Sequence, residues 1–207
     1  MRLILVRHGQ SEHTMRDVSG GPLGCTGLTD RGRQQARALR DGLIADGAYR
    51  DCGALLSSPV PRARETANIL LDSLPVEKVE EDCGLCEIHP GEADGLAWEA
   101  YRARYGAFDL QAQPDRPFSP GGESWRDLTD RIEDTLERFA ARFDGRTVVA
   151  VSHAGFIVVS FLLLFAIPVT GRRGRLEPSH ASLTEWQASN GIWSLVRYND
   201  VRHLNRS

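Results

Sequence analysis

The stretch TVVAVSHAG, residues Thr147–Gly155, decides the fold class. Its first five residues form an unbroken apolar and β-branched run, which is typical of a strand buried on both faces of a sheet. Polar residues Ser152 and His153 end the run, and the apolar segment 154–167 that follows predicts a buried helix. A buried strand followed at once by a helix is the building unit of α/β proteins.

The same alternation extends in both directions along the chain. The patterns predict strands at 2–6, 54–56, 76–79, 147–151, 182–187 and 192–198, and helices at 29–47, 61–74, 96–105, 124–143 and 154–167. We therefore expect an α/β three-layer sandwich, with a mostly parallel central sheet flanked by helices. Residues 1–207 are expected to form a single domain, in which a small cap segment is inserted at about 89–125.

Composition excludes several classes of protein. The chain has 207 residues and a formal net charge of -3, which gives no basic field for binding nucleic acid. The longest apolar run, 156–169, is too short to span a bilayer, which needs about 20 residues. Residues 1–6 are shorter than a signal-peptide core, so we expect a cytoplasmic protein without a membrane partner.

Four cysteines are present, and two of them are closely spaced as Cys83-x-x-Cys86. This spacing occurs in zinc sites and in redox pairs. A structural zinc site also needs a second close cysteine pair or a closely spaced histidine pair, whereas Cys25 and Cys52 stand alone. We therefore expect four reduced cysteines and no metal.

Charged and polar residues follow the predicted strands where each one ends. Arg7 and His8 follow the first predicted strand, and Arg62 follows the second. Glu87 follows the third, and His153 follows the strand at 147–151. The carboxyl ends of parallel strands meet at one edge of a sheet, where ligands bind. Arginines and a protonated histidine can neutralise a phosphate ester, while a neutral histidine attacks phosphorus and a carboxyl group protonates the leaving oxygen.

These residues lie in segments that resemble the histidine phosphatase (phosphoglycerate-mutase-like) superfamily, in order along nearly the whole chain. The matching segments are LVRHGQSE (5–12), GLTDRG with QQA (27–36), SSP through RARETA (57–67), LCEI with two later glycines (85–95), PGGES (120–124), SHAG (152–155) and YND to HL (198–204).

The resemblance implies a role for each of the converging residues. His8 is the nucleophile that becomes phosphohistidine, and Glu87 is the proton donor and later the base that activates water. Arg7, Arg62 and His153 hold the phosphoryl group. No metal and no other cofactor is implied, because side chains supply the positive charge.

Further substrate contacts are implied by Ser11 and Thr14, the latter standing where the family often has asparagine. The Gly-rich loop 15–25 is unusual for the family. In the cap, candidates to face the leaving group are His89, Trp98, Tyr101, Arg102, Arg104, Phe108, Phe118 and Trp125.

The resemblance leaves more than one activity open. A phosphatase acting on a small organic phosphomonoester is favoured, with broad specificity left open and a monomer or homodimer expected. The alternatives are a phosphoglycerate-type mutase and a non-catalytic phospho-ligand-binding protein of the same fold. The family's mutases carry a lysine and an Arg-Arg pair after the segment that corresponds to LCEI (85–88). This chain has no lysine after Lys78, and Arg116 is the only basic residue within 106–120.

Overall fold

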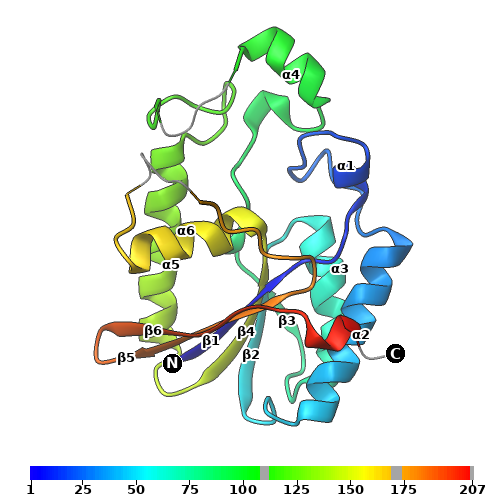
Figure 1. Cartoon of the computed structure of the whole chain (residues 1–207), viewed down its shortest axis with the longest axis vertical. Coiled ribbons are helices and arrows are strands. Elements are labelled where there is room, and N and C mark those ends of the chain that lie inside the picture. The colour runs from blue at the N-terminus through cyan, green and yellow to red at the C-terminus, as the bar shows by residue number, and fades with distance from the viewer. Residues whose placement is uncertain (108–111, 169–173, 206–207) are drawn as a thin grey trace.

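A six-stranded sheet forms the centre of the computed structural model, which describes residues 1–107, 112–168 and 174–205. The strand order is β3-β2-β4-β1-β5-β6 (Figure 1). The first four strands in sequence are mutually parallel, and the last two add an antiparallel edge. The strands are β1 (Arg2–Arg7), β2 (Cys52–Ser57), β3 (Val79–Glu81), β4 (Thr147–Ser152), β5 (Leu183–Ser189) and β6 (Ile192–Asp200).

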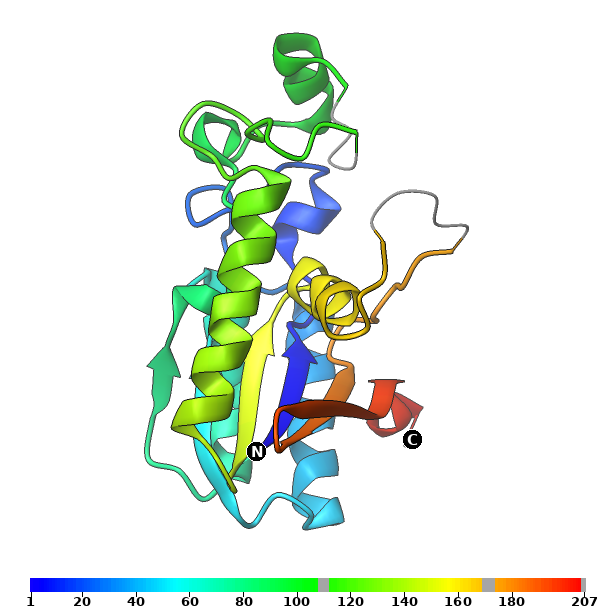
Figure 2. The ribbon, with the colours of Figure 1, turned by 90° about the vertical axis from the view of Figure 1, so that its left-hand side faces the viewer.

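Helices cover both faces of the sheet (Figure 2). Successive side chains of β1 point to opposite faces, so Ile4 packs in the cluster that contains Leu39 and Leu43, while Leu5 packs in the cluster that contains Phe139. The helices of the first face are α2 (Asp30–Asp46) and α3 (Pro61–Leu70), and those of the second are α5 (Trp125–Arg142) and α6 (Ala154–Leu164). The three-layer α/β sandwich with a mostly parallel sheet is thus confirmed.

Capping residues set the helix boundaries that the sequence predicts well. Thr29 precedes α2, and its side chain accepts a hydrogen bond from the Gly32 N–H at 3.0 Å. Gly47 ends α2 in the left-handed conformation that glycine adopts without a steric penalty. Ser124 and Asp127 form a reciprocal capping box at the start of α5.

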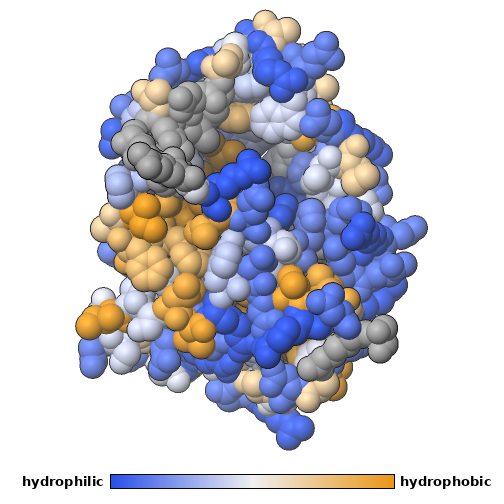
Figure 3. All heavy atoms as spheres, viewed as in Figure 1, coloured by the Kyte–Doolittle hydropathy of each residue, from blue (hydrophilic) through white to orange (hydrophobic). Residues whose placement is uncertain are grey.

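Several predicted boundaries are wrong. The helix expected at 61–74 ends at Leu70, because Leu71–Ser73 form a 3-10 turn instead. The third strand lies at Val79–Glu81 rather than 76–79, because its backbone pairs with Leu55–Ser57 at the edge of the sheet, where acidic side chains reach solvent. Helix α6 ends at Leu164 rather than at 167, since Ala166 takes a positive φ of 49°. Exposed apolar residues gather over α6 in Figure 3, where Phe165 is 48% exposed.

The expectation of four reduced cysteines is wrong for two of them. Cys83 and Cys86 form a disulfide, while Cys25 and Cys52 are free and buried. The short 3-10 helix η2 (Cys83–Leu85) turns the backbone so that the two cysteine Cα atoms lie 4.9 Å apart, within the range that a disulfide spans.

The segment between His89 and Glu123 leaves the sheet layer and returns to the same point, where the Glu123 N–H donates to the His89 carbonyl at 2.9 Å. It contains η3 (Gly91–Ala93) and α4 (Trp98–Tyr105), and it stands beyond the carboxyl ends of the parallel strands with the short helix α1 (Glu12–Met15) (Figure 1). Its centre is aromatic, since the rings of Tyr101 and Phe118 stack with centroids 4.6 Å apart.

The remaining described elements are the 3-10 helices η1 (Leu71–Ser73) and η4 (Arg202–Asn205). Across residues 1–107, 112–168 and 174–205, no helix has both the length and the apolar character needed to cross a membrane.

Candidate active site

A cavity of about 430 Å³ opens where the carboxyl ends of the parallel strands meet the cap. Its walls come from the end of β1, from α1 and the loop after it, from the start of α3, from the Glu87 loop, from the start of α6 and from the cap. The lining residues are Arg7, His8, His13, Thr14, Asp17, Val18, Ser19, Gly20, Arg62, Glu87, Ile88, Pro90, Trp98, Phe118 and Ala154.

His8 lies at the base of this cavity with only 4% of its surface exposed. Its Nε2 atom lies 3.0 Å from Arg62 Nε, and its Nδ1 atom lies 2.7 Å from the Gly9 carbonyl oxygen. A guanidinium can only donate, so Nε2 must accept. The proton therefore resides on Nδ1, which donates to the carbonyl, and Nε2 carries the lone pair of a nucleophile.

The surroundings also keep His8 neutral. Burial lowers the pKa of its imidazole well below 6.5, and the positive charges of Arg62 and Arg7 lower it further. The imidazole therefore keeps its lone pair at neutral pH.

Arg7 and Arg62 supply positive charge that no carboxylate neutralises among the residues described. Arg62 is 2% exposed, and its NH1 group donates to the Gly20 carbonyl at 2.7 Å. Arg7 donates through NH1 to the Pro178 carbonyl, and its NH2 lies 3.1 Å from His180 Nε2. Carbonyl and imidazole partners orient the two guanidiniums without cancelling their charge, which leaves them able to bind a phosphate.

Glu87 reaches the cavity from the loop after β3, and its carboxylate contacts the start of α6. The Gly155 N–H donates to Glu87 Oε2 at 3.0 Å, as an acidic group at a helix N-terminus does. A Cβ on residue 155 would lie only 1.9 Å from Glu87 Oε1. The Glu87 carboxylate can keep this position only while residue 155 is glycine.

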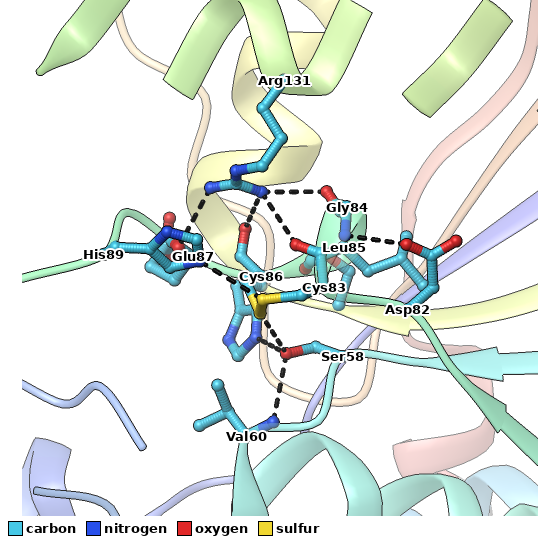
Figure 4. Close-up of a disulfide and its surroundings, with 12 residues drawn as sticks. Ser58, Val60, Asp82, Cys83, Gly84, Leu85, Cys86, Glu87, His89 and Arg131 are labelled. Atoms are coloured by element: carbon cyan, nitrogen blue, oxygen red, sulfur yellow. Dashed lines mark hydrogen bonds between the residues drawn. A yellow bond between two sulfur atoms is a disulfide. The ribbon is translucent and has the colours of Figure 1, made fainter. Parts of the chain in front are cut away.

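The backbone of the Glu87 loop is held by Arg131 of α5 (Figure 4). Its NH1 group donates to the carbonyls of Cys83, Gly84 and Cys86, and its NH2 group donates to that of Glu87. Arg131 is fixed in turn by Glu123, which accepts from Nε at 2.7 Å. This clamp was not found from the sequence, because Arg131 lies in a helix pattern that gives it no special signal.

His153 lies behind His8 and is fully buried, with the two ring centroids 5.1 Å apart. Its Nε2 atom lies 2.9 Å from Ser58 Oγ. Burial, followed by the charge of Arg62, lowers the pKa of His153 well below 6.5. A phosphoryl dianion beside the ring would raise that pKa, because an opposite charge favours the protonated imidazole.

The two further substrate residues expected from the sequence occupy different positions. Thr14 lines the cavity, whereas Ser11 is fully buried and does not line it. The Ser11 hydroxyl lies 2.8 Å from His13 Nδ1 and 3.2 Å from Thr14 Oγ1. Ser11 thus orients two cavity residues.

Sequence reasoning missed His13 and His180. Burial lowers the pKa of each to about 4, with Arg62 adding to the effect at His13 and Arg7 at His180. Topology could have indicated His180: β5 runs antiparallel beside β1, so a residue just before β5 lies near the carboxyl end of β1.

The loop 15–25 contributes four residues to the cavity lining and is tied to the cap. The Asp94 carboxylate accepts hydrogen bonds from the N–H groups of Gly21, Leu23 and Gly24, each at 2.8 Å. Of the cap candidates, Trp98 and Phe118 line the cavity. The others that the structure describes do not line it, and Phe108 lies outside the described residues.

The family model of the histidine phosphatase superfamily (branch 1) matches residues 3–201 of this chain. The chain belongs to the histidine phosphatase superfamily. The resemblance inferred from the Arg-His-Gly and later segments is therefore confirmed.

Known members of the superfamily resemble this chain over most of its length. It is 30% identical to a metal-independent phosphoserine phosphatase of Arabidopsis thaliana, covering 98% of this chain and 83% of the relative. It is 32% identical to a glucosyl-3-phosphoglycerate phosphatase of Mycolicibacterium vanbaalenii, covering 81% and 76% respectively. The solved structure of YhfR from Bacillus stearothermophilus superposes with a TM-score of 0.84 at 26% identity, covering 98% of both chains.

Substitution of Gly155 by alanine tests how Glu87 is positioned in this histidine phosphatase. The added Cβ must displace the Glu87 carboxylate, and a displacement near 1 Å can cost about 100-fold in rate. We expect kcat on alkyl phosphates to fall by about that factor, with a smaller loss on aryl phosphates. The matched control is Gly174→Ala, since no atom of the described residues lies within 4 Å of a Cβ there. Equal activity of the two variants would contradict the close approach.

The buried histidines predict a loss of stability in mild acid. His8, His13, His153 and His180 all have lowered pKa values in the folded protein, so the unfolded chain binds more protons below pH 6.5. Their contribution to the free energy of unfolding is complete above pH 6.5 and decreases as the pH falls from 6.5 toward about 4. The free energy of unfolding, obtained from urea titrations between about pH 8 and about pH 5, should decline with a limiting slope near 1.4 kcal/mol per pH unit for each fully buried histidine. A flat profile would show that these histidines are not buried as described.

Proposed function

We propose that this protein is a phosphomonoester hydrolase that acts through a phosphohistidine intermediate on a small organic phosphate. The observation that carries the proposal is the contact between Arg62 Nε and His8 Nε2 at 3.0 Å. This contact fixes a neutral nucleophile directly beside a positive charge that is free to bind an anion. The superfamily membership of the chain supports the same chemistry.

In the first half-reaction, His8 Nε2 attacks phosphorus while the bond to the leaving oxygen breaks. Glu87 gives its proton to that oxygen, and the product alcohol departs. Arg7 and Arg62 bind the equatorial phosphoryl oxygens, with His153 protonated beside the dianion. Phosphohistidine remains.

In the second half-reaction, the Glu87 carboxylate takes a proton from water as the water oxygen attacks phosphorus. The P–N bond breaks, His8 regains its lone pair on Nε2 and inorganic phosphate is released. The arginines carry the charge stabilisation that a metal ion supplies in other phosphatases, so we propose that no metal takes part in the reaction.

The cavity fits a small substrate. Apolar groups of Ile88, Pro90, Trp98 and Phe118 face the polar base that holds His8. We propose that the segment 89–125 acts as the cap that receives the leaving group. The two phosphatases to which the chain is similar are named for small phosphorylated metabolites, which supports an alkyl phosphate of that size.

Hydrolysis is favoured over mutase activity by the charges in the cavity. Among the described lining residues, the arginines are Arg7 and Arg62 and there is no lysine. Both arginines lie where we propose that the phosphoryl group binds. In the cap, Arg104 pairs with Glu92 instead. A bisphosphorylated intermediate would require a second cationic subsite. A cytoplasmic location and a monomeric or homodimeric state stay predictions.

Replacement of the nucleophile tests the proposed reaction. The wild type should hydrolyse para-nitrophenyl phosphate and retain acid-labile phosphate after quenching. His8→Ala should lose essentially all of both, because it removes the imidazole Nε2 that accepts from Arg62 at the base of the cavity. His203→Gln, in the distant helix η4, is the control and should retain activity. A wild type without turnover would instead favour a phospho-ligand-binding protein, and isomerisation of 3-phosphoglycerate faster than phosphate release would favour a mutase.

The role of Glu87 is tested by varying the leaving group. Glu87→Gln should slow alkyl phosphates by about 100-fold or more, whereas aryl phosphates should be affected far less because aryl oxides leave without a proton. The control is Glu92→Gln, an exposed acid of the cap that pairs with Arg104. Equal losses on both substrate types in steady-state assays would remove Glu87 as the proton donor.

A further inference from the structure

Three groups with metal-ligating atoms lie together beside the catalytic acid, outside the cavity. Cys83, Cys86 and His89 place their sulfur and imidazole nitrogen atoms within 4.8 Å of one another. Of these, Cys83 is exposed to solvent and Cys86 is buried. None of the three lines the catalytic cavity, and the proposed phosphatase mechanism uses none of them.

His89 is oriented toward the sulfur pair by a carboxylate. Its Nε2 atom lies 3.3 Å from Cys83 Sγ, while its Nδ1 atom lies 3.2 Å from Glu123 Oε1. Histidines that bind metals usually donate their second ring N–H to a carboxylate, which fixes the tautomer that leaves the first nitrogen free. Glu123 is fixed by two hydrogen bonds from Arg131, so this orientation is built into the fold.

The turn that carries the cysteines is also fixed (Figure 4). Gly84 packs so tightly against α5 that a Cβ there would lie 2.3 Å from Thr135 Oγ1. Arg131 donates to the carbonyls of Cys83 and Cys86, so the backbone of the turn is held at both cysteines. Two cysteines separated by two residues on a tight turn are a common half of a zinc site.

We propose that reduction of the Cys83–Cys86 disulfide creates a Zn²⁺ site formed by the two cysteine sulfurs and His89 Nε2. A dithiol reductant supplies the two electrons and two protons that cleave the S–S bond, and is itself oxidised to a disulfide. Zinc then displaces both thiol protons into solvent and binds two thiolates and one neutral imidazole. A water molecule is the fourth ligand of the tetrahedral zinc, on the side where Cys83 is exposed to solvent.

Zinc is the metal that this donor set fits best. Thiolates are soft ligands and imidazole suits zinc, whereas magnesium and calcium prefer oxygen ligands. A closed loop through Cys83 and Cys86 is retained in either state: a disulfide when oxidised and a zinc bridge when reduced. Glu87 directly follows Cys86, so both the disulfide and the zinc bridge fix the backbone at the start of the Glu87 loop.

The test compares one untagged full-length protein in two redox states, with no variant required. Protein reduced under argon with a phosphine should retain about one zinc per chain after gel filtration, measured by elemental analysis. The oxidised protein should retain none at this site. Cobalt substitution of the reduced protein should give a thiolate-to-cobalt charge-transfer band and the visible bands of a tetrahedral site.

Variants assign the ligands. Cys83→Ser with Cys86→Ser should abolish the charge-transfer band, and His89→Gln should abolish stoichiometric retention of zinc. Glu123→Gln should weaken zinc binding by about 10- to 100-fold, as loss of an outer-shell partner does. Cys25→Ser and Cys52→Ser are the matched controls, since both thiols are buried and free, and the cobalt spectrum should not change.

Three results would overturn the proposal. The first is a reduced protein that retains no zinc, and the second is equal retention by the oxidised protein. The third is a cobalt complex without the thiolate band, which would place the metal on the active-site histidines instead. Because every readout is metal content or absorption, the outcome is independent of phosphatase activity.

Discussion

The hydrogen bond from Arg62 to the lone pair of His8 is the interaction on which the active site depends. A guanidinium that is 2% exposed and has no carboxylate partner among the described residues is costly to bury. The fold offsets this cost with the His8 nitrogen and the Gly20 carbonyl. Both partners accept hydrogen bonds without neutralising the charge, so the site remains positive and the nucleophile remains neutral.

A second constraint, independent of the first, positions the acid. Glu87 is held from two directions: the start of α6 binds its carboxylate, and Arg131 of α5 binds the carbonyls of its loop. Helices α5 and α6 lie on the same face of the sheet, and the loop after β3 is contacted by Arg131 of α5 and by the first turn of α6. The proposed nucleophile, His8, is thus positioned by strand β1 and the proposed acid, Glu87, by two helices, so each is aligned by a separate set of contacts.

The sequence predicts the parts of the site that depend on strand ends. Arg7, His8, Arg62 and Glu87 each follow a predicted strand, and the structure brings all four to one cavity. The helix starts at Thr29 and Ser124 are also predicted from the sequence, because capping depends on residues within three positions of the helix start.

The missed features depend on contacts between distant segments. His180 reaches Arg7 only because β5 pairs with β1, and the loop 15–25 reaches the cavity only because Asp94 of the cap binds its N–H groups. The disulfide was missed for a different reason. The Cys83-x-x-Cys86 spacing alone does not show the 3-10 turn that brings the two cysteine Cα atoms within 4.9 Å of each other.

The unpaired charge of Arg7 and Arg62 has a consequence for how the protein behaves as its reaction proceeds. In the proposed reaction these cations bind the phosphoryl group of the ester and equally the orthophosphate that hydrolysis releases. The product would then compete with the substrate for the same site, and it would also stabilise the folded chain by mass action. A rise in the concentration of free phosphate around the enzyme would therefore slow the proposed turnover.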